Sequence, residues 1–417
     1  MSGGCQRTGL GSSKNERKRT VVRSLRCKCC RDLLFRFILS LVIVTIRGDS
    51  MYFDPRPKTS RKDLFLRDRE LEELSNLDVP LTLVLGPRRL GKTSLLRVFM
   101  NESDMSFIFT DCRSLVVSGT SVSNYHRLLT KQLNDLAKSK SSILEAVKQI
   151  KGLNLFGVEL ELDSKRSDSF LVESFNALDR WALKEDKTLY LVFDEAQLLR
   201  RFKRNGGLDF NELFSYIYDN LKGLRIILTG SEVGVLEDFI GLDDSSSPLY
   251  GRYVKRLYLS RFTRKESEEF LEKGFKEVGI EASPEILREA VDTLDGIVGW
   301  LVFFGRVCID AERVDRKSIE LTLEKAEIIV NDELSNLKRN STRYISILKA
   351  VAFGSKGWKE IKTATEIIEN NNLTDTAFNR LLNRLIELSY VDFEISGGDK
   401  TYRLVDPVIE SVVRKFV

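Results

Sequence analysis

The chain has 417 residues, of which 42% are hydrophobic and 30% charged, an ordinary composition for a globular protein of two or three domains. The net charge of +5 is concentrated at the start, because residues 1–50 hold 11 of the 66 Lys and Arg but only 3 of the 61 Asp and Glu. The rest is slightly acidic, which excludes a polybasic nucleic-acid-binding protein. One histidine and two cysteines beyond residue 50 leave little room for histidine catalysis and exclude a disulfide framework, so we expect a reducing, cytoplasmic setting.

Residues 1–50 differ from the rest of the chain. Their basic start precedes an apolar stretch whose uncharged part covers only 37–46, about half of the roughly 20 residues needed to cross a bilayer. No small-x-small cleavage site for a signal peptide follows. We interpret this region as lying before a true start at Met51. A weak membrane anchor and a solvated tail are the alternatives.

Residues 51–262 alternate strands and helices, which is typical of an α/β domain with a parallel sheet. Apolar, partly β-branched runs predict strands at 81–85, 105–110, 189–193, 225–229 and 253–259. Helical spacing predicts helices at about 68–77, 94–100, 121–138 and 168–185. Alternation around a glycine in 150–163 predicts an inserted hairpin.

The loop after the first strand carries the most specific motif. Residues 86–93 match G-x-x-x-x-G-K-S/T between a strand and a helix, the setting of a phosphate-binding loop. We expect Lys92 to reach the β- and γ-phosphates of ATP, and the Thr93 hydroxyl to bind Mg²⁺. The alternative is a Gly-rich turn with a chance lysine. The residues predicted to hold the nucleotide here are Gly86, Pro87, Arg88, Arg89, Leu90, Gly91, Lys92, Thr93 and Ser94.

The strand at 189–193 ends in two acids, Asp194 and Glu195. The carboxyl ends of parallel strands meet at one edge of a sheet, so both acids are expected beside the phosphate loop. We predict that Asp194 holds Mg²⁺ and that Glu195 orients and deprotonates the attacking water. The alternative is a pair of solvated acids that cap the next helix.

Two further sites are predicted at turns. Thr229 and Ser231 lie at the end of the next strand, where a polar side chain can sense the γ-phosphate; a plain strand-to-turn signal is the alternative. Arg252 follows a polar loop and the flexible Gly251, and is our candidate for an arginine that stabilises the transferring phosphoryl group. A surface arginine before a strand is the alternative. Supplied from a neighbouring molecule, Arg252 would require a homo-oligomer.

From residue 263 the chain is mainly helical. Helices predicted at about 264–278, 284–294, 297–313 and 316–336 form a small lid over 263–336. Residues 337–417 predict helices at 341–352, 358–369 and 374–389, then a hairpin of strands at 390–395 and 401–404. This order is typical of a winged helix-turn-helix. In the third helix Arg380 and Arg384 are four residues apart and share one face.

With these motifs, residues 51–417 resemble the archaeal ATPase family within the AAA+/STAND group of P-loop NTPases. The most specific carriers are Asp-Pro-Arg-Pro at 54–57, Asp-Glu-Ala-Gln at 194–197 and Gly-x-x-Gly-Trp at 296–300; Gly-Pro-Arg-Arg-Leu-Gly-Lys-Thr-Ser at 86–94, Thr-Gly-Ser at 229–231 and Tyr-Gly-Arg at 250–252 add to them. The resemblance implies a parallel-sheet core at 51–262, a helical lid, a C-terminal winged helix, ATP binding and slow hydrolysis. It also supports Met51 as the start. The chain departs from the family pattern at Val298, where the family usually has Pro.

Three functions compete. The first is an ATP-driven switch whose nucleotide state controls binding of DNA or a protein through the winged helix. The second is a DNA-binding transcriptional regulator with a structural ATP, against which Glu195 argues. The third is a motor, against which the absence of recognisable helicase strand-contact motifs argues. The balance of 13 Lys and Arg to 10 Asp and Glu in residues 335–417 leaves duplex DNA and a protein open as partners; a membrane is not expected.

Overall fold

The structure is a computed structural model that describes residues 52–139, 141–148, 167–204 and 207–416. The interpretation of residues 1–50 and the hairpin predicted within 150–163 lie outside this part of the chain. No helix in the described ranges combines the length and the apolarity that crossing a membrane requires.

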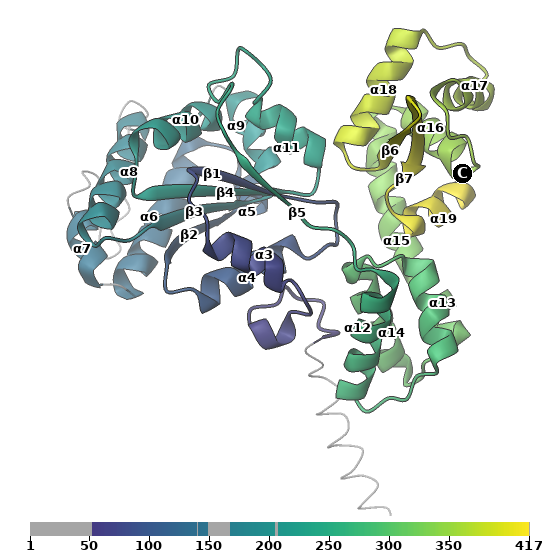
Figure 1. The fold of residues 1–417 in the computed structure, drawn as a ribbon. Coiled ribbons are helices and arrows are strands. Elements are labelled where there is room, and N and C mark those ends of the chain that lie inside the picture. Colours follow the sequence, from purple (N-terminus) through teal and green to yellow (C-terminus); the bar gives the residue numbers. More distant parts are fainter. Residues whose placement is uncertain (1–51, 140, 149–166, 205–206, 417) are drawn as a thin grey trace, which may run out of the picture.

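A five-stranded parallel sheet forms the first part of the molecule (Figure 1). Its order is β2-β3-β4-β1-β5. The strands are β1 (Leu81–Leu85), β2 (Ser106–Asp111), β3 (Leu189–Asp194), β4 (Leu224–Gly230) and β5 (Lys255–Tyr258). All five predicted strands are present. Since β4 lies between β1 and β3 and all run the same way, the loops that follow these three strands meet at one edge.

Helices cover both faces of the sheet because alternate residues of each strand point to opposite sides. Val84 packs with the face that carries α3 (Asp68–Ser75) and α4 (Lys92–Glu102). Leu83 packs with the other face, covered by α6 (Val122–Ser139), α8 (Ser167–Lys184) and α10 (Phe210–Asn220). Shorter pieces complete the core: η1 (Arg61–Asp63), α5 (Cys112–Ser118), α7 (Ser141–Lys148), η3 (Ala196–Leu199), α9 (Arg200–Arg204) and α11 (Val233–Ile240).

Three helices follow the sheet: α12 (Arg264–Glu277), α13 (Pro284–Leu294) and α14 (Val298–Ala311). Phe53, from the lead-in to the sheet domain, is fully buried between α12 and α14. A Cβ added at Gly274 or at Gly305 would lie 2.2 Å from its ring. Glycine at both positions therefore makes room for Phe53. The inserted Phe53 side chain holds these two helices against the sheet domain.

The C-terminal unit lies beyond α15 (Arg316–Asn340), a long helix that runs through the predicted domain boundary at residue 336 (Figure 1). The unit has the predicted order of three helices and a hairpin: α16 (Thr342–Ala352), α17 (Trp358–Glu369), α18 (Asp375–Glu387), then antiparallel β6 (Val391–Ser396) and β7 (Asp399–Leu404). A helix that was not predicted, α19 (Pro407–Lys415), packs against α13, α15 and α16.

Candidate nucleotide-binding site

The loop between β1 and α4 needs an unusual backbone. Gly86 and Gly91 have φ of 150° and 88°, and Arg89 has φ of 68°, a conformation that non-glycine residues seldom adopt. A Cβ at Gly86 would lie 2.9 Å from the Leu259 carbonyl oxygen. Helix α4 then starts at Lys92. The loop therefore ends at a helix N-terminus, where unpaired amides favour an anion.

Lys92 lies at the floor of this loop and is only 5% exposed. Its Nζ donates to the carbonyl oxygens of Gly86 at 2.5 Å and Pro87 at 2.7 Å. Burial lowers the pKa of Lys92 to about 8, although the charges of Glu195 and Asp194 oppose this effect. The side chain is thus a buried cation enclosed by the loop.

Asp194, at the end of β3, connects helix α4 to strand β4 through its side chain. Its carboxylate accepts a hydrogen bond from the Thr93 hydroxyl at 2.8 Å and one from the Thr229 hydroxyl at 2.6 Å. The guanidinium of Arg113 lies 3.5 Å away. Mg²⁺ prefers oxygen ligands of this kind, so the neighbouring Thr93 and Asp194 oxygens fit the predicted metal site. Arg113 was not predicted here, because no local pattern links it to Asp194.

Glu195 lies next to Asp194 but is held differently. Its backbone has φ of 57°, and one carboxylate oxygen, Oε2, accepts three hydrogen bonds. The donors are the Gln197 amide at 2.7 Å, the Ser231 hydroxyl at 2.8 Å and the Ser231 N–H at 3.2 Å. Ser231, predicted as a γ-phosphate sensor, therefore contacts the predicted catalytic base. Thr229, the other predicted sensor, donates to the Asp194 carboxylate and accepts a hydrogen bond from the Glu195 backbone N–H at 3.2 Å.

The loop borders a cavity of about 680 Å³. The lead-in at 52–58 lines it, and so does α14 through Val298, Phe303 and Arg306. Helix α14 also touches the loop directly, because the Gly299 N–H donates to the Arg89 carbonyl at 2.8 Å. The wall formed by residues 52–58 was not predicted, although the Asp-Pro-Arg-Pro motif lies within it.

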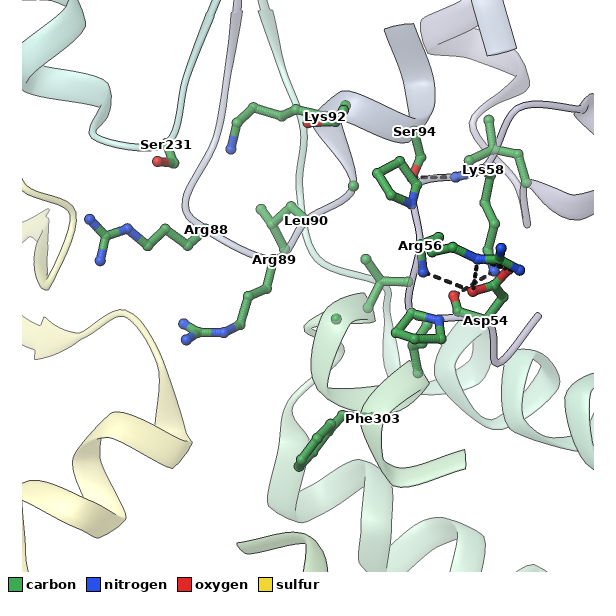
Figure 2. Close-up of a pocket in the computed structure, with 18 of the residues that line it drawn as sticks. Asp54, Arg56, Lys58, Arg88, Arg89, Leu90, Lys92, Ser94, Ser231 and Phe303 are labelled. Carbon is green, nitrogen blue, oxygen red and sulfur yellow. Dashed lines mark hydrogen bonds and ion pairs between the residues drawn. The ribbon is translucent and has the colours of Figure 1, made fainter. Parts of the chain in front are cut away.

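The loop arginines bind acids outside the loop. Arg88 pairs with Glu232 at 2.9 Å and with Glu333 at 3.4 Å, and Arg89 also pairs with Glu333. Figure 2 shows both side chains extending from the loop toward the C-terminal unit, while Asp54 and Lys58 lie on the opposite side of the cavity. The predicted nucleotide contacts of these two arginines are thus left to their backbone, because their guanidinium groups already have carboxylate partners.

The structure does not bring Arg252 into this cavity. It precedes β5, at the end of the sheet opposite the phosphate loop, and its guanidinium pairs with Asp219 at 2.6 Å. It also donates to the Pro248 carbonyl. Any contact between Arg252 and a phosphate has to be made with a neighbouring molecule.

Comparison with known proteins agrees with this geometry. The sequence model of a family described as an ATPase domain predominantly from Archaea matches residues 64–304. The solved structure of the Walker-type ATPase PABY2304 of Pyrococcus abyssi is 36% identical, with a TM-score of 0.73, and the match covers 87% of this chain and 99% of that one. The ORC2 protein of Aeropyrum pernix, solved as ADPNP–ADP complexes, is 14% identical, with a TM-score of 0.55 and coverage of 87% and 97%. At that identity it is evidence for the fold alone. No curated protein matches the chain.

Proposed function

Because the chain belongs to the family of ATPase domains found predominantly in Archaea, we propose that it is an ATP-driven switch whose nucleotide state controls how its C-terminal unit binds DNA or a protein. Family membership, together with the P-loop fold of the AAA+ type, makes the chain an ATP-binding and ATP-hydrolysing protein. The switch, its partner and the roles of single residues are the proposed part.

In this proposal the phosphate loop and Lys92 hold the β- and γ-phosphates, and Thr93 and Asp194 hold Mg²⁺, which would neutralise phosphate charge. Glu195 acts as the general base. Hydrolysis is slow because Glu195 must first give up some of the hydrogen bonds that Ser231 and Gln197 donate to its carboxylate. The same exchange of partners links the chemistry to the segment that follows β4.

That segment carries the proposed switch. Two residues after Ser231, the N–H of Val233 donates to the Ser389 hydroxyl at 3.2 Å. Next to it, a Cβ at Gly234 would lie 2.6 Å from the Cα of Glu387, the last residue of α18. The short segment 231–234 therefore connects Glu195, the proposed base, to the end of α18. A change at Glu195 on hydrolysis would be transmitted to that helix, which is the second helix of the proposed helix-turn-helix pair.

Duplex DNA is the first partner to test. Arg380 on α18 is exposed, whereas Arg384 pairs with Glu387 at 2.6 Å. Arg380 is therefore the better candidate to read a base edge, and Arg380→Ala should weaken duplex binding by roughly 1–3 kcal/mol. Binding should also fall steeply with salt. Arg288→Ala, an exposed arginine of α13 that pairs with Glu285, is the matched control and should change little.

The decisive experiment measures ATPase rate with and without duplex DNA, and amide hydrogen exchange in α18 with ATP and with ADP. The switch predicts different exchange protection of α18 in the two nucleotide states. Equal protection would refute the switch. Altered protection without salt-sensitive duplex binding would indicate that the partner is a protein and not DNA.

A further inference from the structure

Asp406, in the C-terminal unit, touches three parts of the molecule at once. It precedes α19 and caps that helix, because its Oδ1 accepts from the N–H groups of Val408 at 2.9 Å and Ile409 at 3.4 Å. The indole N–H of Trp300, in α14, donates to both carboxylate oxygens at 3.1 and 2.9 Å. The guanidinium of Arg89, in the phosphate loop, lies 3.6 Å from Oδ2.

This carboxylate is buried, with only 7% of the residue exposed. Burial raises the pKa of Asp406, and the Trp300 hydrogen bond and the charge of Arg89 oppose that rise. A buried carboxylate is stable only when charged or hydrogen-bonding groups surround it. Asp406 lies between Trp300 and Arg89, and its hydrogen bonds with the indole and its charge beside the guanidinium hold both side chains in position.

Arg89 needs such support. Its φ of 68° is a conformation that a non-glycine residue keeps only where its surroundings enforce it. Here the Gly299 N–H holds its carbonyl, the Trp300 ring lies 4.3 Å from its guanidinium carbon, and Glu333 and Asp406 hold its charge. The phosphate loop and the C-terminal unit pack closely, because the space left between them is a cavity of only about 30 Å³.

We infer that Asp406 is a positioning residue for ATP binding. Through Arg89 it keeps the phosphate loop in the shape that directs the loop amides at the phosphates. The C-terminal unit thus supports the ATP site through the phosphate loop. This inference rests on the proposed role of the phosphate loop and Lys92 in holding ATP, and it is independent of the switch and its partner.

The linkage has a thermodynamic consequence. If docking of the C-terminal unit improves the affinity for ATP, then ATP must strengthen the docking by the same factor. ATP should therefore protect the amides of α19 and of the loop before it from hydrogen exchange, even when hydrolysis is blocked.

The test compares ATP affinity, measured by calorimetry, in four proteins: wild type, Asp406→Asn, Arg89→Gln and the double variant. Asn retains an oxygen that can cap α19 and accept from Trp300, so Asp406→Asn removes mainly the charge that faces Arg89. We expect each single variant to bind ATP roughly tenfold more weakly and the double variant to bind no more weakly than the singles. KM should rise in Asp406→Asn while kcat at saturating ATP is kept.

Asp209→Asn is the matched control. Asp209 also caps a helix, α10, and pairs with a cation, Lys203 at 2.7 Å, but it does not line the cavity. Its ATP affinity should equal that of the wild type.

Wild-type affinity in folded Asp406→Asn, or losses that add fully in the double variant, would overturn the inference. If Asp406→Asn does not fold, Arg89→Gln decides alone: unchanged affinity overturns the inference, and a tenfold loss supports it. A wild-type protein that binds ATP no better than Lys92→Ala would instead overturn the proposed function, and this inference with it.

Discussion

Asp194 and Glu195 are adjacent acids with different surroundings. Asp194 ends β3, where its two oxygens accept from the hydroxyls of Thr93 and Thr229. Glu195 begins a turn in the left-handed region, which directs its carboxylate to Ser231 and Gln197. The change from extended backbone at Asp194 to left-handed backbone at Glu195 thus directs the predicted metal ligand and the predicted base to different partners.

This separation predicts that binding and hydrolysis can be uncoupled at Glu195. Gln keeps the shape of Glu but cannot accept a proton from water, so Glu195→Gln should still bind ATP while kcat falls by roughly 10²-fold or more. Steady-state rates and the ATP-induced shift in Tm measure the two effects. Glu237→Gln, at the surface pair with Arg256, serves as control. Hydrolysis at the wild-type rate in Glu195→Gln would place the base elsewhere.

The buried ammonium of Lys92 predicts a pH dependence of ATP binding. Its pKa is lowered to about 8 in the free protein, whereas a neighbouring phosphate favours the charged form. Above pH 8 the free protein must therefore take up a proton when it binds ATP, and affinity should fall by up to about tenfold per pH unit.

Calorimetry at pH 9 in buffers of different ionisation enthalpy should count about one proton taken up per ATP. In Lys92→Arg, whose guanidinium stays charged, this uptake should disappear. The same pKa shift disfavours the nucleotide-free fold below about pH 8. Since the unfolded lysine titrates near 10.5, that penalty should fade as the pH rises through this window. Constant ATP affinity from pH 7 to 9.5 would contradict the burial argument.

Among the elements, α14 lies directly against the phosphate loop, because the Gly299 N–H donates to the Arg89 carbonyl. It begins at Val298, after Ile297 in an extended conformation with ψ of 102°. Gly299 lies so close that a Cβ there would be 2.7 Å from the Cβ of Arg89. The contact between α14 and the loop therefore requires glycine at position 299. Position 298, the first residue of the helix, tolerates other side chains.

This difference predicts opposite results at two neighbouring positions. Proline suits the first residue of a helix and an extended preceding residue, so Val298→Pro should keep ATP affinity and leave stability unchanged or raise it by less than about 1 kcal/mol. Gly299→Ala should weaken ATP binding, because its Cβ displaces Arg89. Thermal unfolding and calorimetry measure both. Loss of ATP binding in Val298→Pro would mean that the valine side chain makes an essential contact with the loop.

Element order was predictable wherever the apolar period was strong. The predicted bounds of 284–294 and 358–369 coincide with α13 and α17, and the strand run before Asp194 and Glu195 placed both acids beside the loop. Helix α19 was missed because Val408, Ile409, Val412 and Val413 are β-branched residues that favour strands, and burial against neighbouring helices overrides that preference.

Contacts between distant residues could not be predicted in the same way. The pair of Trp300 and Asp406 spans 106 residues, and that of Arg88 and Glu333 spans 245. A local sequence period or motif cannot predict which residues so far apart in the chain come into contact. The motif Gly-x-x-Gly-Trp could mark Trp300 as special, but only the fold identifies the carboxylate that it meets.

On the scale of the whole molecule, the cavity beside the phosphate loop is formed mainly by the sheet domain, its lead-in and α14, whereas Arg252 lies at the opposite end of the sheet. The phosphate loop follows the carboxyl end of β1, and Arg252 precedes the amino end of the parallel strand β5. Its guanidinium therefore cannot reach the phosphates bound by its own chain. If it stabilises the transferring phosphoryl group, it must do so in a second copy of the chain.

This geometry predicts that two inactive variants restore activity in each other's presence. Arg252→Ala should keep ATP affinity and lose hydrolysis, and Lys92→Ala should lose ATP binding while keeping its own Arg252. In a mixture, Arg252 of the Lys92→Ala chain can enter the intact site of the Arg252→Ala chain, so ATPase activity should exceed the sum of the two proteins assayed apart. The double variant Lys92→Ala, Arg252→Ala has no arginine to offer and should give no gain when mixed with Arg252→Ala. A mixture that is merely additive, or wild-type hydrolysis by Arg252→Ala alone, would reduce Arg252 to the surface partner of Asp219.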